Sequence, residues 1–289
     1  MCLFRGWIYD RVVVVDGNIV FGLLGFEPAR KSRLNRLLPG VTCDGAIAFR
    51  DAVIKGNQLM LQLFAQFCKE GINQKFKFVH VVLTDGEDNK SQISLQEFLR
   101  YQQYLEQELP QNILQTFYIG VNVENNTTVQ KEMQAILRCS GKSASYYPIS
   151  SNEINEIFQK IQMQIGIRIQ EQELIIANNQ ARIALKQQTY EPVVSMQINN
   201  YIVLFTLDVS GSMKNNWYKV CYAVKNFLGI LGQNDLVLGI IFNDEVKVLT
   251  VNQQPTAKKV QQPSQPPRKP SYQSRQVDQT SESCCCQIF

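Results

Sequence analysis

The sequence predicts an α/β protein in which a doubly wound, mainly parallel sheet carries helices on both faces. Short continuous apolar runs, the pattern of strands buried on both faces, alternate with segments whose apolar side chains recur at helical spacing. The chain has 289 residues, 45% of them hydrophobic and 19% charged, which is ordinary for a globular protein with a large core. This composition excludes collagen-like, coiled-coil and wholly disordered proteins.

The first segment, residues 1–165, supplies most of the predicted sheet. Its apolar run NIVFGLLGF, residues 18–26, predicts a buried strand, and a basic polar loop extends from there to about Asp44. The elements expected next are, in order, a helix over 46–70, a strand in FKFVHVVLTDGEDN, a helix over 95–109, the strand TFYIGV, a helix over 128–139, a short strand over 146–149 and a helix over 152–164. Strands and helices that alternate in this way build a Rossmann-like parallel sheet.

The rest of the chain divides into a linker, a second segment and a tail. Residues 166–199 mix a period of two with a helical period, and we assign them to a linker. Residues 200–250 predict a buried strand in YIVLFTLDVSGSM, an amphipathic helix over 217–231 and a hairpin in LVLGIIFNDEVKVLT. Residues 251–289 are rich in Pro, Gln and Ser and predict a disordered tail.

The net charge of +4 does not indicate a nucleic-acid partner. In residues 251–289, five basic residues stand against two acidic ones, so most of the positive excess lies in the tail. A nucleic-acid-binding domain normally carries that excess on its fold. We therefore expect no nucleic acid to bind.

The segment Asp208-Val209-Ser210-Gly211-Ser212 lies where a buried strand ends and a helix is about to begin. Ligands bind at this edge of an open α/β sheet. The spacing of two turns Asp208, Ser210 and Ser212 toward one point if the backbone stays extended, and Gly211 allows a tight bend. One carboxylate and two hydroxyls suit Mg²⁺ better than Zn²⁺. The structural alternative is that Ser210 or Ser212 caps the next helix.

A second acidic turn, Thr84-Asp85-Gly86-Glu87-Asp88, also ends a buried strand and brings Asp85 to the same edge. Together, DVSGSM and VVLTDGEDN resemble the metal-ion-dependent adhesion site of the von Willebrand factor type A (VWA) domain, written D-x-S-x-S, then a Thr, then an Asp in a T-D-G turn. The resemblance extends to FRDAV, YIGV and SYYPISSNEINEIFQKI, and covers most of residues 15–165 and 200–250.

The resemblance implies a divalent cation and a protein ligand. The cation, Mg²⁺ with Mn²⁺ and Ca²⁺ as alternatives, would be held by Asp208, Ser210, Ser212 and Asp85. An acidic side chain of the ligand would complete the coordination. The middle motif departs from the family, because the closest alignment puts Ile47 in the Thr position, and Thr42 could serve only if the loop were rearranged. Ile offers no oxygen, so we expect a weak or degenerate site.

The order of the motifs also departs from the family, because the D-x-S-x-S segment comes last. Either the chain is circularly permuted, with residues 200–250 supplying the first strand and helix, or it carries two incomplete modules in tandem. Family topology requires the strand at 202–207 to lie beside the strand at 78–83, and we expect the strand at 18–26 on its other side, where 236–242 competes. The halves meet within one chain or between the chains of a homodimer that exchanges them.

Two other motifs carry no chemistry. His80, the chain's single histidine, lies within a buried strand and reads as a packed side chain rather than a catalytic one. The run Ser140-Gly141-Lys142-Ser143 is like the end of a P-loop, but the first glycine of that pattern would fall at Ile136, so it is not a nucleotide site.

The last residues suggest a lipid anchor. Cys286-Gln287-Ile288-Phe289 fits a C-a-a-X motif, so we expect prenylation of Cys286, with Cys284 and Cys285 as palmitoylation candidates and the basic tail against anionic lipid. A chance match is the alternative. The cysteines of the body have no metal-like spacing and are those of a reduced, cytosolic protein. The protein is then expected on the cytosolic face of a membrane.

These features predict a protein-binding module of VWA type with a weak metal site, tethered to a membrane, and not an enzyme. A degenerate scaffold that binds no metal is the alternative. A hydrolase that uses the Ser and Asp side chains ranks lower, because no general base stands in sequence near Ser210 or Ser212.

Overall fold

The computed structural model describes residues 13–15, 18–20, 26–29, 32–110, 112–165, 200–232 and 234–249. The predicted linker at 166–199, the tail at 251–289 and the three cysteines Cys284, Cys285 and Cys286 lie outside these residues.

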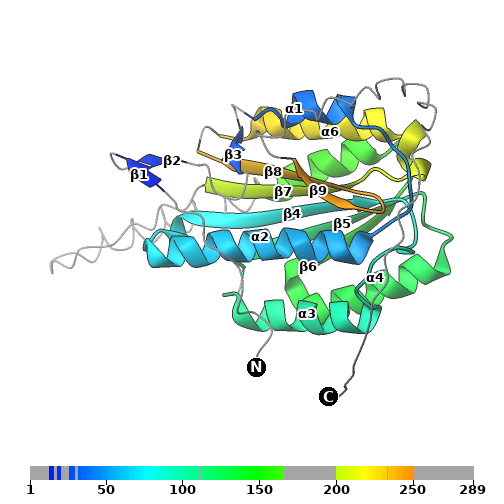
Figure 1. The fold of residues 1–289 in the computed structure, drawn as a ribbon, viewed down its shortest axis with the longest axis horizontal. Helices are drawn as coiled ribbons and strands as arrows, with labels where there is room; N and C mark the ends of the chain where they lie inside the picture. Colours follow the sequence, from blue (N-terminus) through cyan, green and yellow to red (C-terminus); the bar gives the residue numbers. More distant parts are fainter. Residues whose placement is uncertain are drawn as a thin grey trace, which may run out of the picture. The chain divides into compact units, whose positions relative to one another are not determined.

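The main sheet of the described residues has the strand order β3-β8-β7-β4-β5-β6, and β9 pairs with β8 (Figure 1). Its strands are β3 (Glu27–Pro28), β4 (Phe76–Thr84), β5 (Leu114–Val121), β6 (Ala144–Ile149), β7 (Asn200–Asp208), β8 (Leu236–Phe242) and β9 (Val246–Leu249). The five strands from β8 to β6 are parallel, and β3 and β9 are antiparallel to β8.

Helices cover both faces of this sheet. One face carries α1 (Leu34–Leu37), α6 (Trp217–Ile230) and the helical residues 154–165, and the other carries α2 (Phe49–Lys69), α3 (Leu95–Glu108) and α4 (Thr127–Ser140) (Figure 1). The 3₁₀ turns whose bounds the described residues give are η2 (Leu38–Gly40), η3 (Asn73–Lys75), η4 (Gly141–Ser143) and η5 (Gly211–Asn215). None of the helices described is long and apolar enough to cross a bilayer.

The side chains of β7 alternate between the hydrophobic clusters on the two faces of the sheet. Val203 and Phe205 pack with the cluster beneath α6, whereas Ile202 and Leu204 pack with the cluster beneath α2. Successive side chains of a strand point to opposite faces, so a strand with helices on both sides must be apolar throughout. The predicted α/β class, with a mostly parallel, Rossmann-like sheet between two helical layers, is confirmed.

One predicted neighbour of β7 is right and the other is wrong. Ile202 to Leu207 pairs in parallel with Phe78 to Leu83, as predicted. On its other side lies β8, whereas β2 (Asn18–Val20) pairs with β1 (Val13–Val15) in a separate two-stranded sheet. Because β8 follows β7 through α6, closing this unit needs only a short crossover, which favours β8 over the distant run at 18–26.

A second difference lies before Asp44, where the sequence predicts only a polar loop. The structure has α1 and η2 there, and they bury Leu34 and Leu38 against the cluster beneath α6. Both elements are short, so the apolar spacing that identifies a helix is hardly present in their sequence.

His80 is a fully buried member of a polar contact between α2, β4 and β7. Its Nδ1 lies 2.9 Å from Oδ1 of Asn57, and its Nε2 lies 2.8 Å from Oγ1 of Thr206. Burial lowers the pKa of His80 to about 3, so the ring is neutral at physiological pH. The prediction of a packed, structural histidine agrees with these contacts.

We expect His80 to make the fold acid-sensitive. Its folded pKa lies below that of the unfolded chain, so its contribution is complete above about pH 6.5 and is lost as the pH falls, because only the unfolded chain takes up the proton. Relative to His80→Gln, the wild-type free energy of unfolding should decrease by about 1 kcal/mol between about pH 7 and pH 5.5. Urea titrations of both chains at each pH measure this difference, and identical pH dependence would contradict it.

Two helical glycines should respond oppositely to alanine. A Cβ on Gly56 of α2 would lie 2.8 Å from Cδ2 of Leu204 and 2.9 Å from Cε1 of His80, so Gly56→Ala should lower the free energy of unfolding by about 1–3 kcal/mol. A Cβ on Gly229 of α6 would have nothing within 4 Å, and Gly229→Ala should raise the free energy of unfolding by roughly 0.5–1 kcal/mol. Chemical denaturation tests both, and stabilisation by Gly56→Ala would show that the helix has room there.

Candidate functional site

The ends of β7 and β4 bring the two predicted acidic turns together. The strands are parallel neighbours, so Asp208 at the end of β7 and Thr84 at the end of β4 reach the same edge of the sheet. Oγ1 of Thr84 donates a hydrogen bond of 2.7 Å to Oδ2 of Asp208. The next residue after Thr84 is Asp85, which places the second carboxylate at this edge.

Hydrogen bonds connect the four candidate ligands. The backbone N–H of Ser210 donates to Oδ1 of Asp208 at 2.8 Å, and the Oγ atoms of Ser210 and Ser212 lie 3.0 Å apart. Oγ of Ser212 donates to Oδ1 of Asp85 at 2.8 Å. Asp208 and Ser210 are buried, Asp85 is half-buried and Ser212 is exposed, so the site opens to solvent on the side of Ser212 and Asp85.

The capping alternative does not describe these serines. Ser210 is the N-cap residue of η5, yet its side chain makes no capping hydrogen bond. Asn216 is the N-cap of α6, so neither serine holds that position. Both hydroxyls instead turn toward the two carboxylates.

The site concentrates negative charge in a partly dehydrated place. Burial, followed by repulsion from Asp85, raises the pKa of Asp208 to about 6, against the hydrogen bonds from Ser210 and Thr84. Burial also raises the pKa of Asp85, although the hydroxyls of Ser212 and Ser210 lower it. A buried carboxylate with a raised pKa beside a second carboxylate is a common mark of a binding or catalytic site.

The loop at residues 41–48 closes one side of the site through backbone hydrogen bonds. The N–H of Asp44 donates to the carbonyl of Val209 at 2.9 Å, and the N–H of Gly211 donates to the carbonyl of Gly45 at 3.2 Å. Gly45 has φ of 76°, and a Cβ there would lie 3.0 Å from Oδ1 of Asp244. Only glycine accommodates this conformation and this close approach easily, which identifies Gly45 as a residue that shapes the site.

The turn between β8 and β9 holds the same loop from the other side. Nδ2 of Asn243 donates to both the carbonyl and Oδ1 of Asp44, and the N–H of Ala46 donates to Oδ1 of Asp244. The N–H of Ala48 donates to the carbonyl of Asn243 at 2.9 Å. Residues nearly 200 positions apart in sequence therefore fix one loop.

Ile47 and Thr42 are the two candidates for the Thr position of the family's middle motif. Ile47 is buried, and its Cδ1 would lie 2.7 Å from a Cβ on Gly86, so it packs against the T-D-G turn beside Asp85. Thr42 is exposed and lines a neighbouring cavity with Asp44 and Asn243. Among the hydrogen bonds described, none joins Thr42 to the four candidate ligands.

Cys43 is a neighbour of the site that the sequence analysis missed. Burial, followed by the charges of Asp208, Asp44 and Asp85, raises the pKa of its thiol to about 11, so it lies within the field of both candidate carboxylates. Its position directly after Thr42 is the one sequence signal that could have pointed to it.

The remaining acidic residues of the T-D-G turn have structural partners. Oδ2 of Asp88 lies 3.2 Å from Nε of Arg50 in a partly buried ion pair, and the Asp88 carboxylate accepts hydrogen bonds from the backbone N–H groups of Arg50 and Ser91. Nε of Arg50 also lies 3.1 Å from Oε1 of Glu132. These contacts tie the turn to the start of α2 and leave Asp85 as the carboxylate directed at Ser212.

The chemistry of the site is that of hydroxyl and carboxylate oxygens. Within the described ranges, no group of three or more His, Cys, Asp or Glu side chains could hold a metal ion. A cation at Asp208 and Asp85 would therefore depend on the serine hydroxyls and on water as further ligands, a donor set that suits Mg²⁺ and disfavours Zn²⁺.

No family model matches the chain, and no curated protein matches it. A solved structure of an uncharacterised protein from Alicyclobacillus acidocaldarius is similar at 16% sequence identity and a TM-score of 0.39, over 61% of this chain and 79% of that chain. A TM-score of this size does not establish a shared fold.

Asp208→Asn should stabilise the protein in metal-free buffer at neutral pH. An amide removes the buried charge, its oxygen can still accept from the N–H of Ser210, and its NH₂ can donate to the hydroxyl of Thr84. We expect the free energy of unfolding to rise by roughly 1–3 kcal/mol, since a folded pKa of about 6 disfavours the ionised carboxylate.

Asp235→Asn is the matched control for this prediction. Both oxygens of Asp235 accept from backbone N–H groups, those of Tyr201 and Gly232, so an amide must point its NH₂ at one of them and destabilise the fold. Urea denaturation compares both variants with the wild type. Destabilisation by Asp208→Asn to the same extent would mean that Asp208 serves the fold rather than a ligand.

Proposed function

We propose that the chain forms a circularly permuted VWA-type module that binds a protein ligand through a weakly held divalent cation, with Mg²⁺ favoured. The observation that carries this proposal is the convergence of Asp208, Ser210, Ser212 and Asp85 at one sheet edge, within a chain of hydrogen bonds of 2.8–3.0 Å. Two segments more than 120 residues apart each contribute the motif that the other lacks.

The strand order supports the permuted arrangement. The resemblance requires the D-x-S-x-S strand, the first of the family, to lie beside the strand that ends in T-D-G. β7 pairs with β4 over eight residue pairs, from Phe76↔Asn200 to Leu83↔Leu207. Under this proposal, residues 200–230 would supply the first strand and helix of the family, although the family's other motifs precede them in this sequence.

The side chains of the site fit a small, hard cation. They offer two carboxylates and two hydroxyls and no sulfur or nitrogen. Burial, and after it the repulsion from Asp85 that a cation would compensate, raises the pKa of Asp208. Asp208, Ser210, Ser212 and Asp85 would hold the ion. Ile47 supplies no oxygen beside Asp85, so water would take that place and the affinity would be low.

A bound cation would supply a positive charge that attracts a carboxylate. The serine hydroxyls are neutral, so the ion's charge is not fully cancelled and an acidic side chain of a partner remains attractive. That side chain would approach past Ser212 and Asp85, the two candidate ligands that solvent reaches. The buried side chains of Asp208 and Ser210 would hold the ion on the side away from solvent.

Metal binding should depend on Ser212. Isothermal titration of the full chain with MgCl₂ should show weak, saturable uptake, and Ser212→Ala should weaken it about tenfold by removing one ligand oxygen and the hydrogen bond to Asp85. Ser94→Ala is the matched control, because Ser94 caps α3 through Glu97 and takes no part in the site. Absence of metal uptake by the wild type would leave the metal-free scaffold as the better function.

Ligand binding should require both the metal and an acidic side chain. A short capped peptide with one aspartate should perturb the NMR signals of the loops at 41–48 and 84–91 when Mg²⁺ is present, and EDTA should reverse the change. The same peptide with asparagine should not bind, and Asp208→Asn should abolish the response. Equal binding of both peptides, or binding that persists in EDTA, would rule out a metal-bridged carboxylate.

A further inference from the structure

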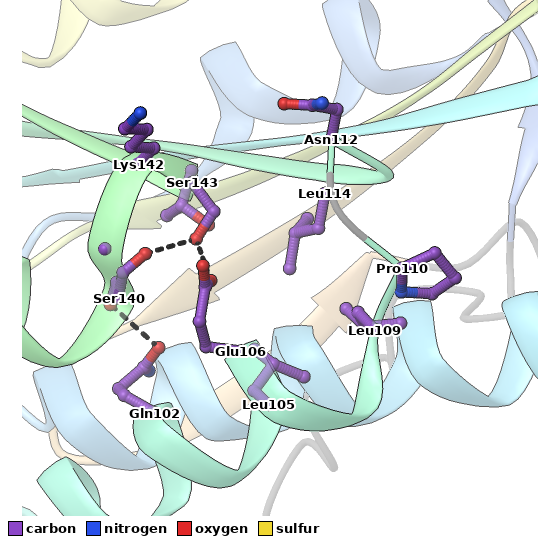
Figure 2. A pocket seen from close by; sticks show the side chains of 12 residues that line it. Gln102, Leu105, Glu106, Leu109, Pro110, Asn112, Leu114, Ser140, Lys142 and Ser143 are labelled. Carbon is purple, nitrogen blue, oxygen red and sulfur yellow. Dashed lines mark hydrogen bonds between the residues drawn. The ribbon is translucent and has the colours of Figure 1, made fainter.

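A second concave site lies at the opposite edge of the sheet, where β5 and β6 begin (Figure 2). The cavity has a volume of about 370 Å³, large enough for a small organic group. Four apolar side chains form one wall: Leu105, Leu109, Pro110 and Leu114. The cavity is therefore separate from the candidate metal site and independent of the proposed function.

One carboxylate, that of the exposed Glu106, lines this cavity. Glu106 projects into it from the last turn of α3 and accepts a hydrogen bond of 2.6 Å from Oγ of Ser143 (Figure 2). The carboxyl-terminal ends of α3 and α4 both border it, and helix carboxyl termini carry partial negative charge. The last turn of α3 contains no basic residue, whereas that of α4 contains Arg138.

Two lysines, Lys142 and Lys77, lie near this cavity. Lys142 lines the cavity, but its side chain extends away from Glu106 (Figure 2), and among the described residues no ion pair joins the two. Lys77 directs its Nζ to the carbonyl of Asn112 at 3.1 Å, on the outer rim. One backbone oxygen of the lining, that of Asn112, thus already accepts a hydrogen bond from an alkylammonium group.

The buried side-chain amide of Gln102, in the wall of the cavity, has one atom without a hydrogen-bond partner. Gln102 is 3% exposed; its Oε1 receives only a long hydrogen bond of 3.4 Å from Oγ of Ser140, and its Nε2 has no partner. Turning the amide over would exchange its two atoms and still leave one without a partner. Buried polar groups are nearly always paired, and in that turned orientation Nε2 donates to Oγ of Ser140 while Oε1 is the unpaired atom, an acceptor that an N–H donor such as an ammonium group would complete.

We propose that this cavity binds an alkylammonium group, carried by a small organic amine or by a lysine side chain. The ammonium would lie at the Glu106 carboxylate and the helix carboxyl termini, and the methylene chain along the wall of Leu105, Leu109, Pro110 and Leu114. This division of the cavity matches a ligand with an apolar stem and a cationic head. The run Ser140-Gly141-Lys142-Ser143, which is not a P-loop, forms the rim around that head.

Titration of the ¹⁵N-labelled full chain with pentylamine tests the proposal. Pentylamine should shift the amide signals of Leu105 and Leu114 in a saturable way, whereas pentanoate and pentanol, of the same length, should not. Capped lysine, with capped norleucine as its control, distinguishes the sources: its binding points to a protein lysine, and binding of pentylamine alone points to a free amine.

The decisive comparison uses two variants of the same helix end. Glu106→Gln should weaken amine binding about fivefold, because it removes the charge and keeps an oxygen for Ser143. Glu108→Gln makes the same change of charge in the same turn, but Glu108 does not line the cavity, so it should leave binding unchanged. Absence of saturable shifts with either amine, equal effects of the two variants, or equally strong binding of pentanoate would overturn the proposal.

Discussion

The parallel pairing of β7 with β4 is the interaction on which the rest of the structure depends. It joins two segments that lie more than 120 residues apart, and it places β7 between β8 and β4 in the middle of the sheet. The apolar side chains of β7 contribute to the clusters on both faces, so neither core is complete without it. The same pairing sets the ends of the two strands level, and Asp208 meets Thr84 and Asp85 only for that reason.

Much of this arrangement is readable from the sequence, because buried parallel strands and amphipathic helices have distinct patterns. The helix at 95–109 and the strand that ends at Thr84 illustrate it: the structure has α3 at Leu95–Glu108 and β4 at Phe76–Thr84. The convergence of Asp208 and Asp85 follows from the rule that parallel strands end at one edge. The choice between 18–26 and 236–242 does not follow, since the two runs have the same apolar pattern and chain connectivity decides between them.

The surroundings of the site are less predictable than its ligands. Gly45, Asn243 and Asp244 come from opposite ends of the described chain, and their contacts depend on the registers of β7, β8 and β9, which no local pattern contains. Cys43 and Ile47 lie where they do because this loop is held between the β8–β9 turn and the T-D-G turn. The repulsion between Asp208 and Asp85 is a cost of this assembly, and the hydrogen bonds from Thr84, Ser210 and Ser212 offset part of it.

Mn²⁺ binding by complementary variants tests most directly whether one chain supplies both halves of the proposed cation site. Water proton relaxation should detect Mn²⁺ on the wild type and on neither Asp208→Asn nor Asp85→Asn, because each variant lacks one carboxylate. An equimolar mixture of the two variants, unfolded and refolded together, should also fail to bind, since every chain then carries one defective site. Binding restored in the mixture would show that the halves are exchanged between chains, and binding retained by either single variant would show that the two carboxylates do not share an ion.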